Sequence, residues 1–313
     1  MNVYHSLDEY KKGHKTHVTI GTFDGVHIGH RAILDRIIAE AREVGGESLL
    51  ISFHPHPRMV LRPDDHSLRL LQTQEEKVAV LNSIGLDKIL FIPFTQAFSK
   101  LTSEQYIQQI LIDTVDPEKI VIGYDHRFGH DRKGGIAELE KYAAIHSYEV
   151  EEIPVQAVDD ALVSSTKIRE ALQEGDVSTA AKYLGYEYSF AGEVVHGEKQ
   201  GRLLGYPTAN MDPEDKLKLI PAHGVYFVRV FVEQQAYYGM MNIGVKPTMG
   251  EFQPSHEVYI FDFDQMIYGK TIRVSFIEWI RSEKKFNGLD ELIAAIDGDR
   301  DYCLKRIAEL ENA

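Results

Sequence analysis

The stretch VTIGTFDGVHIGH, residues 18–30, joins a short apolar run to a segment with helical spacing. Beyond it, Ile33, Ile37 and Ala41 repeat at four-residue steps, which is the period of one helix face. The glycines at positions 21, 25 and 29 allow the backbone to approach a ligand closely. A helix that begins here offers unpaired N–H groups and the positive end of its dipole. The stretch therefore predicts a strand, a glycine-rich turn and a helix start that suits an anion.

Apolar runs and helical patterns alternate through the rest of the N-terminal half. Strands are predicted at residues 18–21, 48–53, 88–92, 119–123 and 148–154, with helices between them. Strand–helix alternation favours a parallel sheet with helices on both faces, so the fold class of this half is α/β. Ligands of such sheets bind beyond the carboxyl ends of the strands.

The pattern changes near residue 186, where β-branched and aromatic runs separated by Gly and Pro begin. Runs at residues 225–232, 257–263 and 272–280 predict a mainly antiparallel β-barrel or sandwich. Two helical patterns close the chain, one on each side of Asp297-Gly298. We therefore expect two domains, at residues 1–185 and 186–313, with the boundary between residues 180 and 189.

The 313 residues include 34 Lys and Arg against 48 Asp and Glu, a formal net charge of −14. This charge repels nucleic acid and anionic membranes, so we expect neither as a partner, and an anionic substrate needs a local positive site. The single cysteine, Cys303, excludes an intrachain disulfide and fits a reducing compartment. The first 15 residues do not resemble a secretory signal and no run of 18 apolar residues occurs, so we expect a soluble, cytoplasmic protein. The oligomeric state stays open, a homo-oligomer included.

His27 and His30 are three residues apart near the predicted helix start. At this spacing both rings can face one side of the helix and donate hydrogen bonds to phosphate oxygens. The chain contains neither a Gly-x-x-x-x-Gly-Lys-Ser/Thr loop nor a Gly-x-Gly-x-x-Gly turn, so the site differs from a P-loop or a dinucleotide fingerprint. Taken alone, the same residues also fit a solvated turn with one or two capping roles.

The pattern Gly-x-Phe-Asp-Gly-x-His-x-Gly-His resembles the His-x-Gly-His nucleotidylyltransferases and, in this form, the bacterial FAD synthetases. The segments FHPHPR at 53–58, GYDHRFG at 123–129 and SSTKIR at 164–169 support the resemblance, although the last alone also fits a plain helix cap. The resemblance implies a Rossmann-like domain that adenylylates FMN with ATP and Mg²⁺, with FAD and pyrophosphate as products. It implies that His27 and His30 hold the α- and β-phosphates, and that Thr166 and Arg169 hold the leaving pyrophosphate. The ATP-binding residues that it implies are Gly21, Thr22, Phe23, Asp24, Gly25, Ser165, Thr166 and Arg169, and the residues near the flavin are Asp125 and Phe128.

A second motif, GRLLGYPTAN at residues 201–210, resembles the signature of riboflavin kinases. Thr208 and Asn210 are two residues apart, so an extended backbone places both side chains on one face, and their oxygens suit Mg²⁺. Without the family, Pro-Thr-Ala-Asn also fits a turn. The resemblance implies that Glu257, in EVYIFDFD at residues 257–264, is the general base, whereas its residue type alone also fits an exposed strand-edge carboxylate. It further implies that the ATP-binding residues are Gly201, Arg202, Gly205, Pro207 and Thr208. The flavin-binding residues that it implies are Arg281 and Phe286, in RSEKKF at 281–286, and the metal ligands are Thr208 and Asn210.

The combined prediction is a bifunctional enzyme that phosphorylates riboflavin to FMN and then adenylylates FMN to FAD. ATP is the co-substrate of both steps, Mg²⁺ is the expected cofactor, and riboflavin, FMN and FAD are the expected small-molecule partners. One alternative is an enzyme with a single working half, or one whose first domain uses another mononucleotide acceptor. A second alternative is a flavin-binding regulator without turnover.

Overall fold

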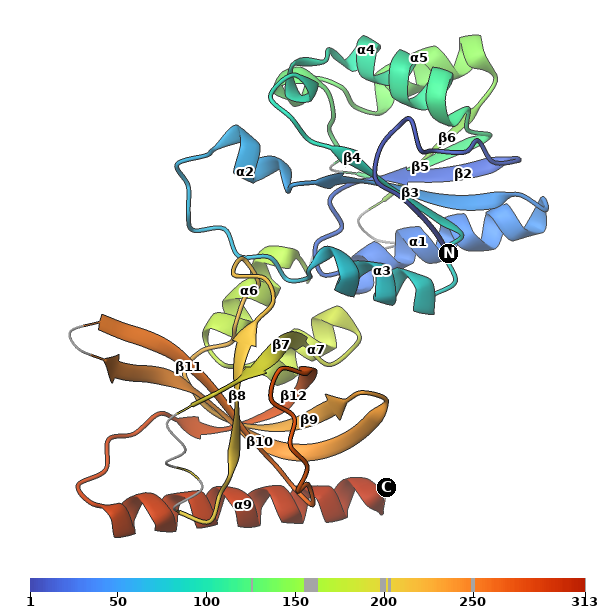
Figure 1. The fold of residues 1–313 in the computed structure, drawn as a ribbon. Helices are drawn as coiled ribbons and strands as arrows, with labels where there is room; N and C mark the ends of the chain where they lie inside the picture. Colours follow the sequence, from blue (N-terminus) through green and yellow to red (C-terminus); the bar gives the residue numbers. More distant parts are fainter. Residues whose placement is uncertain (125, 155–162, 198–200, 202–203, 249–250, 313) are drawn as a thin grey trace. The chain divides into compact units, whose positions relative to one another are not determined.

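The computed structural model describes residues 1–124, 126–154, 163–197, 201, 204–248 and 251–312 (Figure 1). The chain divides into two compact units, Met1–Ser165 and Thr166–Ala313. Among the predicted site residues, Asp125 and Arg202 lie outside the described residues.

The first unit contains a six-stranded sheet in which every pair of neighbouring strands is parallel. In chain order the strands are β1 (Asn2–Tyr4), β2 (Thr16–Ile20), β3 (Glu47–His54), β4 (Lys88–Pro93), β5 (Lys119–Gly123) and β6 (Glu149–Ile153). Their order in the sheet is β1-β4-β3-β2-β5-β6. The chain therefore leaves β2 toward one edge of the sheet and returns to its other side at β5. This is a topological switch point, where sheets of this kind bind ligands.

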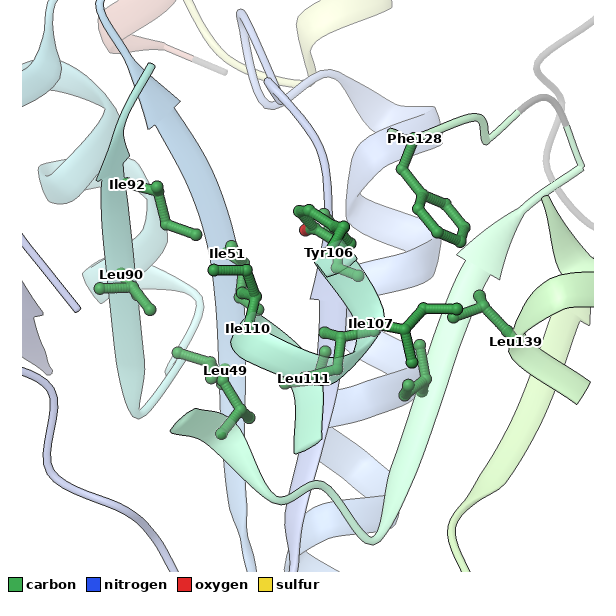
Figure 2. Close-up of a cluster of buried hydrophobic side chains, with 14 of the residues drawn as sticks. Leu49, Ile51, Leu90, Ile92, Tyr106, Ile107, Ile110, Leu111, Phe128 and Leu139 are labelled. Carbon is green, nitrogen blue, oxygen red and sulfur yellow. The ribbon is translucent and has the colours of Figure 1, made fainter. Parts of the chain in front are cut away.

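Helices cover both faces of this sheet (Figure 1). On one face, apolar residues of α1 such as Leu34 and Ile37 pack with Leu50 of β3. On the other face, Ile107 and Leu111 pack with Leu49 of β3 in the cluster that Figure 2 shows. The strands are apolar on both sides because both sides are covered. The helical segments are α1 (Ile28–Glu43), α2 (Pro57–Leu61), α3 (Gln74–Ser83), η1 (Phe98–Lys100), α4 (Ser103–Tyr106), the π-helix η2 (Ile107–Val115), η3 (His130–Arg132) and α5 (Ile136–His146).

The five strands expected in this half are all present, and the parallel α/β fold is confirmed. The short edge strand β1 was not predicted, because three partly exposed residues leave no periodic signal.

The second unit is a closed barrel of six strands that pair antiparallel, in the order β10-β11-β8-β7-β12-β9. Large aromatic side chains such as Tyr226 and Phe276 are fully buried, and their rings pack edge to face at 5.1 Å between centroids. The strands are β7 (Ser189–Val195), β8 (Thr208–Pro213), β9 (Gly224–Val232), β10 (Gln235–Thr248), β11 (Glu251–Ile260) and β12 (Thr271–Ser282). The predicted antiparallel barrel is confirmed. The helices α6 (Ser165–Gln173) and α7 (Val177–Leu184) precede the barrel, and α9 (Leu289–Glu311) follows it.

The C-terminal helix α9 is one continuous helix, where the sequence predicted two patterns separated at Asp297-Gly298. Tertiary contacts on both sides of Gly298 explain its continuity. Asp297 accepts a hydrogen bond from the Tyr206 hydroxyl, and the buried Asp299 forms a bidentate ion pair with Arg281 on β12. These bonds outweigh the roughly 1 kcal/mol that a glycine costs inside a helix.

No helix in the described part of the chain is both long enough and apolar enough to cross a membrane.

Candidate active sites

The turn between β2 and α1 carries an unusual backbone. Phe23, Gly25 and Val26 have positive φ angles of 46°, 90° and 37°. Glycine adopts this region freely, whereas a β-branched residue such as Val26 is strained there, at a cost of order 1–3 kcal/mol. Such strain persists only where the surroundings impose the conformation.

Asp24 supplies that restraint. Its side chain is only 3% exposed, and its carboxylate accepts the backbone N–H groups of Leu71 at 3.1 Å and Gln72 at 3.2 Å. Its own carbonyl accepts the hydroxyl of Ser165 at 2.8 Å. Asp24 therefore ties the turn to the segment before α3 and to Ser165, the last residue of the first unit. The sequence predicted only that it would line the nucleotide pocket.

His27 is the N-cap of α1, and its ring accepts the backbone N–H of His30 at Nδ1, at 3.3 Å. A ring nitrogen that accepts a hydrogen bond carries no proton. The proton of the neutral ring is therefore assigned to Nε2, which becomes a donor. The sequence motif thus fixes both the cap of the helix and the tautomer of the first histidine.

Three aromatic rings lie in a row at this helix start. The rings of His27 and His30 stack with centroids 3.6 Å apart, and the ring of Phe23 lies 4.5 Å from that of His30. Burial lowers the pKa of His27 to about 4 and holds the pKa of His30 well below its ordinary value. Both histidines are therefore neutral at pH 7. The Nδ1 atom of His30 is buried without a hydrogen-bond partner among the described residues. Buried polar atoms are nearly always hydrogen-bonded, so this atom suits a bound ligand.

Lys77 on α3 brings a buried ammonium group to the same turn. It is 9% exposed, and its Nζ donates to the carbonyl of Thr22 at 2.6 Å. Burial lowers the pKa of Lys77, while the carboxylate of Asp24 acts to raise it. The positive charge of Lys77 in turn helps to lower the pKa of His30. The anion site therefore combines neutral histidines with one buried cation.

The remaining predicted residues of the adenylyl-transfer site are placed as follows. Gly21 and Thr22 belong to the same turn, and Ser165 bonds to its backbone. Thr166 and Arg169 lie on α6 within the second unit, and their role stays a prediction. Phe128 is 6% exposed and belongs to the apolar cluster on one face of the sheet, where its ring lies 5.3 Å from that of Tyr106 (Figure 2).

The second predicted site gathers on two neighbouring strands of the barrel. Glu257 on β11 lies opposite Asn210 on β8, and Tyr259 lies opposite Thr208. Directly opposed residues of antiparallel strands share a face, so Thr208, Asn210 and Glu257 are together. The Thr208 hydroxyl donates to Oε2 of Glu257 at 3.1 Å. Two motifs 49 residues apart in the sequence therefore meet in one hydrogen bond.

Ser255 completes the surroundings of Glu257. Its hydroxyl donates to Oε1 of Glu257 at 2.9 Å, so each carboxylate oxygen accepts a different hydroxyl. Ser255 is two residues before Glu257 on β11 and is 7% exposed.

Two glycines pack closely against the segment that carries Thr208 and Asn210. A Cβ atom at Gly197 would lie 2.2 Å from the amide nitrogen of Asn210, and one at Gly201 would lie 2.4 Å from the carbonyl of Tyr206. Only glycine permits this approach of the backbone. The predicted residues Gly205 and Pro207 lie in the same loop and are exposed.

Tyr206 fixes the end of this loop against α9. Its hydroxyl donates to Asp297 and accepts a hydrogen bond from Arg300 at 3.1 Å, and burial raises its pKa to about 12. The predicted flavin residue Arg281 also reaches α9, through its ion pair with Asp299 at 2.7 Å. Phe286 lies close to Arg281, with the guanidinium carbon 5.7 Å from the ring centroid.

Sequence reasoning missed Lys77 and Ser255, and it missed how Asp24 holds the turn. Lys77 lies beside the Thr73–Glu76 capping box of α3, where a lysine carries no signal of burial. Ser255 had one usable signal, its i, i+2 spacing from a predicted catalytic residue on a strand.

Two family models match the chain. A model of FAD synthetase matches residues 9–167, and a model of riboflavin kinase matches residues 184–307.

Curated relatives match along nearly the whole chain. The bifunctional riboflavin kinase/FMN adenylyltransferase of Listeria monocytogenes is 35% identical over 308 residues, which cover 98% of this chain and 97% of the relative. The protein of the same name from Bacillus subtilis is 36% identical over 303 residues, covering 95% and 94%. A crystal structure from Streptococcus pneumoniae, titled a macrolide-efflux protein, has a TM-score of 0.85 at 31% identity and covers 96% of this chain and 97% of its own.

Proposed function

The chain belongs to the family of bifunctional riboflavin kinases and FMN adenylyltransferases, and on that premise we propose which of its residues carry the two reactions. The enzyme uses ATP to phosphorylate riboflavin to FMN, and it uses ATP again to adenylylate FMN to FAD. The single observation that carries our assignment is the hydrogen bond from Thr208 to Glu257, because it brings the two kinase motifs into one site.

In the adenylyl-transfer reaction, a phosphate oxygen of FMN attacks the α-phosphorus of ATP. The bond from that phosphorus to the α–β bridging oxygen breaks, and pyrophosphate leaves. We assign the Nε2–H group of His27 and the ring of His30 to the α- and β-phosphate oxygens. Neutral donors held at a helix start stabilise the charge that develops there without a proton transfer. Gly21, Thr22, Phe23 and Gly25 shape the ATP pocket, Asp24 holds the turn, and Ser165 binds ATP. Thr166 and Arg169 bind the departing pyrophosphate.

In the kinase reaction, Glu257 accepts the proton of the riboflavin 5′-hydroxyl as that oxygen attacks the γ-phosphorus. The bond to the β–γ bridging oxygen breaks, and ADP leaves. This general-base role is supported by the position of Glu257 beside Thr208 and Asn210 on the neighbouring strand. Gly201, Gly205 and Pro207, which lie in the loop before β8, are assigned to ATP together with Arg202, and Arg281 and Phe286 are assigned to the flavin side.

Thr208 and Asn210 fit a magnesium ion. A hydroxyl and an amide oxygen are hard ligands, and the two residues share one face of β8. The Thr208 hydroxyl can keep its proton on Glu257 while a lone pair of the same oxygen faces a cation. When bound, Mg²⁺ supplies positive charge to the phosphates of ATP.

We further propose that the enzyme works in the cytoplasm on small molecules alone, with neither nucleic acid nor a membrane as partner. The single cysteine and the net charge of −14 support this. Residues 1–185 and 186–313 are the proposed functional domains.

The proposed roles are tested with two variants, each of which should lose one reaction and keep the other. Glu257→Gln removes the base and should lower FMN formation from riboflavin and ATP-Mg²⁺ by about 10²–10⁴-fold. The same variant should still form FAD from supplied FMN at the normal rate. His27→Asn should do the reverse, because its Oδ1 can keep the cap of α1 while the Nε2–H donor is lost.

The products are separated by chromatography and followed over time. Each variant serves as the folding control of the other, since each retains one activity. Normal FMN formation by Glu257→Gln would remove Glu257 from the kinase mechanism, and normal FAD formation by His27→Asn would remove His27 from the adenylyl-transfer site.

A further inference from the structure

The carboxylate of Glu257 is held from two directions. Thr208 approaches Oε2 from the neighbouring strand β8, at 3.1 Å, and Ser255 approaches Oε1 from β11 itself, at 2.9 Å. Two donors on different oxygens fix both the position and the plane of a carboxylate, because rotation about the last side-chain bond would break both bonds.

Ser255 and Thr208 differ in what else they face. Thr208 lies beside Gly201 of the loop before β8, and it is assigned to the magnesium ion. Ser255 is buried at 7% exposure, and the hydrogen bond of its side chain ends on Glu257. A buried hydroxyl needs a partner, so the serine and the carboxylate restrain each other.

We propose that Ser255 is a positioning residue of the riboflavin kinase reaction, which holds the general base Glu257 in the orientation that receives the substrate proton. The inference rests on the proposed role of Glu257. Ser255 itself touches neither substrate in this scheme, and it acts through the carboxylate. A general base works only within hydrogen-bond reach of its proton, and small displacements of a catalytic group cost rate.

The first measurement is the steady-state kinetics of FMN formation by Ser255→Ala. The variant lacks the hydroxyl and keeps nearly the same volume. We expect kcat to fall about tenfold, with the KM values for riboflavin and ATP unchanged, because the interaction matters in the transition state and not in substrate binding. Ser255→Thr retains the hydroxyl and suits a strand, so it should restore kcat to within about threefold of the wild type.

A double-mutant cycle tests whether the effect passes through Glu257. In the Glu257→Gln background, Ser255→Ala should change the residual kcat by less than about twofold. A tenfold fall in that background as well would overturn the inference, since Ser255 would then act without the carboxylate. A normal kcat for Ser255→Ala alone would overturn it too and would leave the role of Glu257 intact. A normal kcat for Glu257→Gln would remove the kinase assignment, and the inference with it.

Two controls distinguish positioning from folding. Ser275→Ala removes another buried hydroxyl of the same barrel, on β12, where Ser275 accepts a hydrogen bond from Arg273 at 3.2 Å. It should leave FMN formation within about twofold of the wild type. FAD formation from supplied FMN reports on the adenylyl-transfer site and should be normal in the Ser255 and Ser275 variants. If Ser275→Ala lowers kcat as much as Ser255→Ala does, loss of any buried hydroxyl suffices and the inference fails.

Discussion

At the scale of single residues, Lys77 supplies local positive charge at the anion site of a protein whose net charge is negative. A protein with a charge of −14 needs local positive charge to hold a triphosphate, yet His27 and His30 are neutral at pH 7. Lys77 places an ammonium group within 2.6 Å of the carbonyl of Thr22, at the strained turn. Lys77→Met removes this charge and keeps most of the side-chain volume. We expect FAD formation from FMN and ATP to fall by at least about tenfold.

The matched control is Lys88→Met. Lys88 is also a buried lysine of the first unit, but it lies at the first residue of β4, at the opposite end of the strands. Its Nζ donates to Glu47 at 2.8 Å and to the carbonyl of Lys11 at 3.1 Å. Both variants lose a buried ammonium group and some stability, and only Lys77→Met should lose activity at a temperature well below unfolding. Equal rates of FAD formation in the two variants would contradict this role of Lys77.

The kinase site was predicted from the resemblance to a known family, because the type of each residue alone left other roles open. The structure brings Glu257, Thr208 and Asn210 together in the barrel, and their roles in the reaction stay predictions. Tertiary partners could not be predicted. Arg281 was expected at the flavin, and the structure pairs it with Asp299 on α9, which lies 18 residues further along the chain. Local sequence does not predict such an ion-pair partner, because the pairing depends on how α9 packs against the barrel.

At the scale of elements, we expect a substitution at Gly298 to stabilise helix α9. It lies inside α9, and a Cβ atom built there would meet nothing within 4 Å. Alanine in a helix interior is favoured over glycine by about 0.5–1 kcal/mol, since the unfolded chain loses less entropy. Gly298→Ala should therefore raise the free energy of unfolding of the second unit by that amount. Urea unfolding followed by the fluorescence of Trp279, the single tryptophan of the chain, measures it.

Gly269→Ala is the contrasting control for this prediction. A Cβ atom at Gly269 also meets nothing within 4 Å, but the residue has a φ of +73°. The two glycines thus differ in backbone conformation and not in available space. Gly269→Ala should destabilise the barrel, because alanine is strained at that angle. Equal effects of the two substitutions would show that α9 does not hold Gly298 in a helical conformation.

The elements themselves were predictable wherever the apolar period was strong. The runs at residues 48–53 and 225–232 are mostly apolar, and the structure has β3 and β9 there. The continuity of α9 was not predicted, because Asp-Gly is a local stop signal. In the folded chain, Asp297 and Asp299 on either side of Gly298 are both bound to residues outside the helix.

At the scale of the whole molecule, buried neutral histidines make stability depend on pH. The pKa values of His17, His27, His30 and His256 are all lowered, with burial as the leading cause in each. Between the ordinary pKa of 6.5 and the folded value of about 4 for His27, the unfolded chain binds a proton that the folded chain does not. Stability is therefore fully present above pH 6.5 and is lost as the pH falls below it.

The loss of stability at low pH should arise in both units, and the single tryptophan allows the second unit to be followed separately. His27 belongs to the first unit and His256 to the second, while Trp279 reports only on the second. We expect the free energy of unfolding from far-UV circular dichroism to fall between pH 6.5 and pH 4.5, with His27 contributing at most about 1.4 kcal/mol per pH unit. The lowered pKa values of the other buried histidines act in the same direction. His27→Asn should reduce the slope of the free energy of unfolding against pH by the contribution of one proton. The pH dependence of the transition that Trp279 reports should not change, because the substitution lies in the first unit. His14→Asn, at an exposed position, is the control and should reproduce the wild-type curve. A His27→Asn curve that runs parallel to the wild type from pH 6.5 to pH 4.5 would mean that His27 binds its proton equally well in the folded and unfolded chains. The assignment of a neutral His27 ring, with Nδ1 as acceptor, would then be wrong.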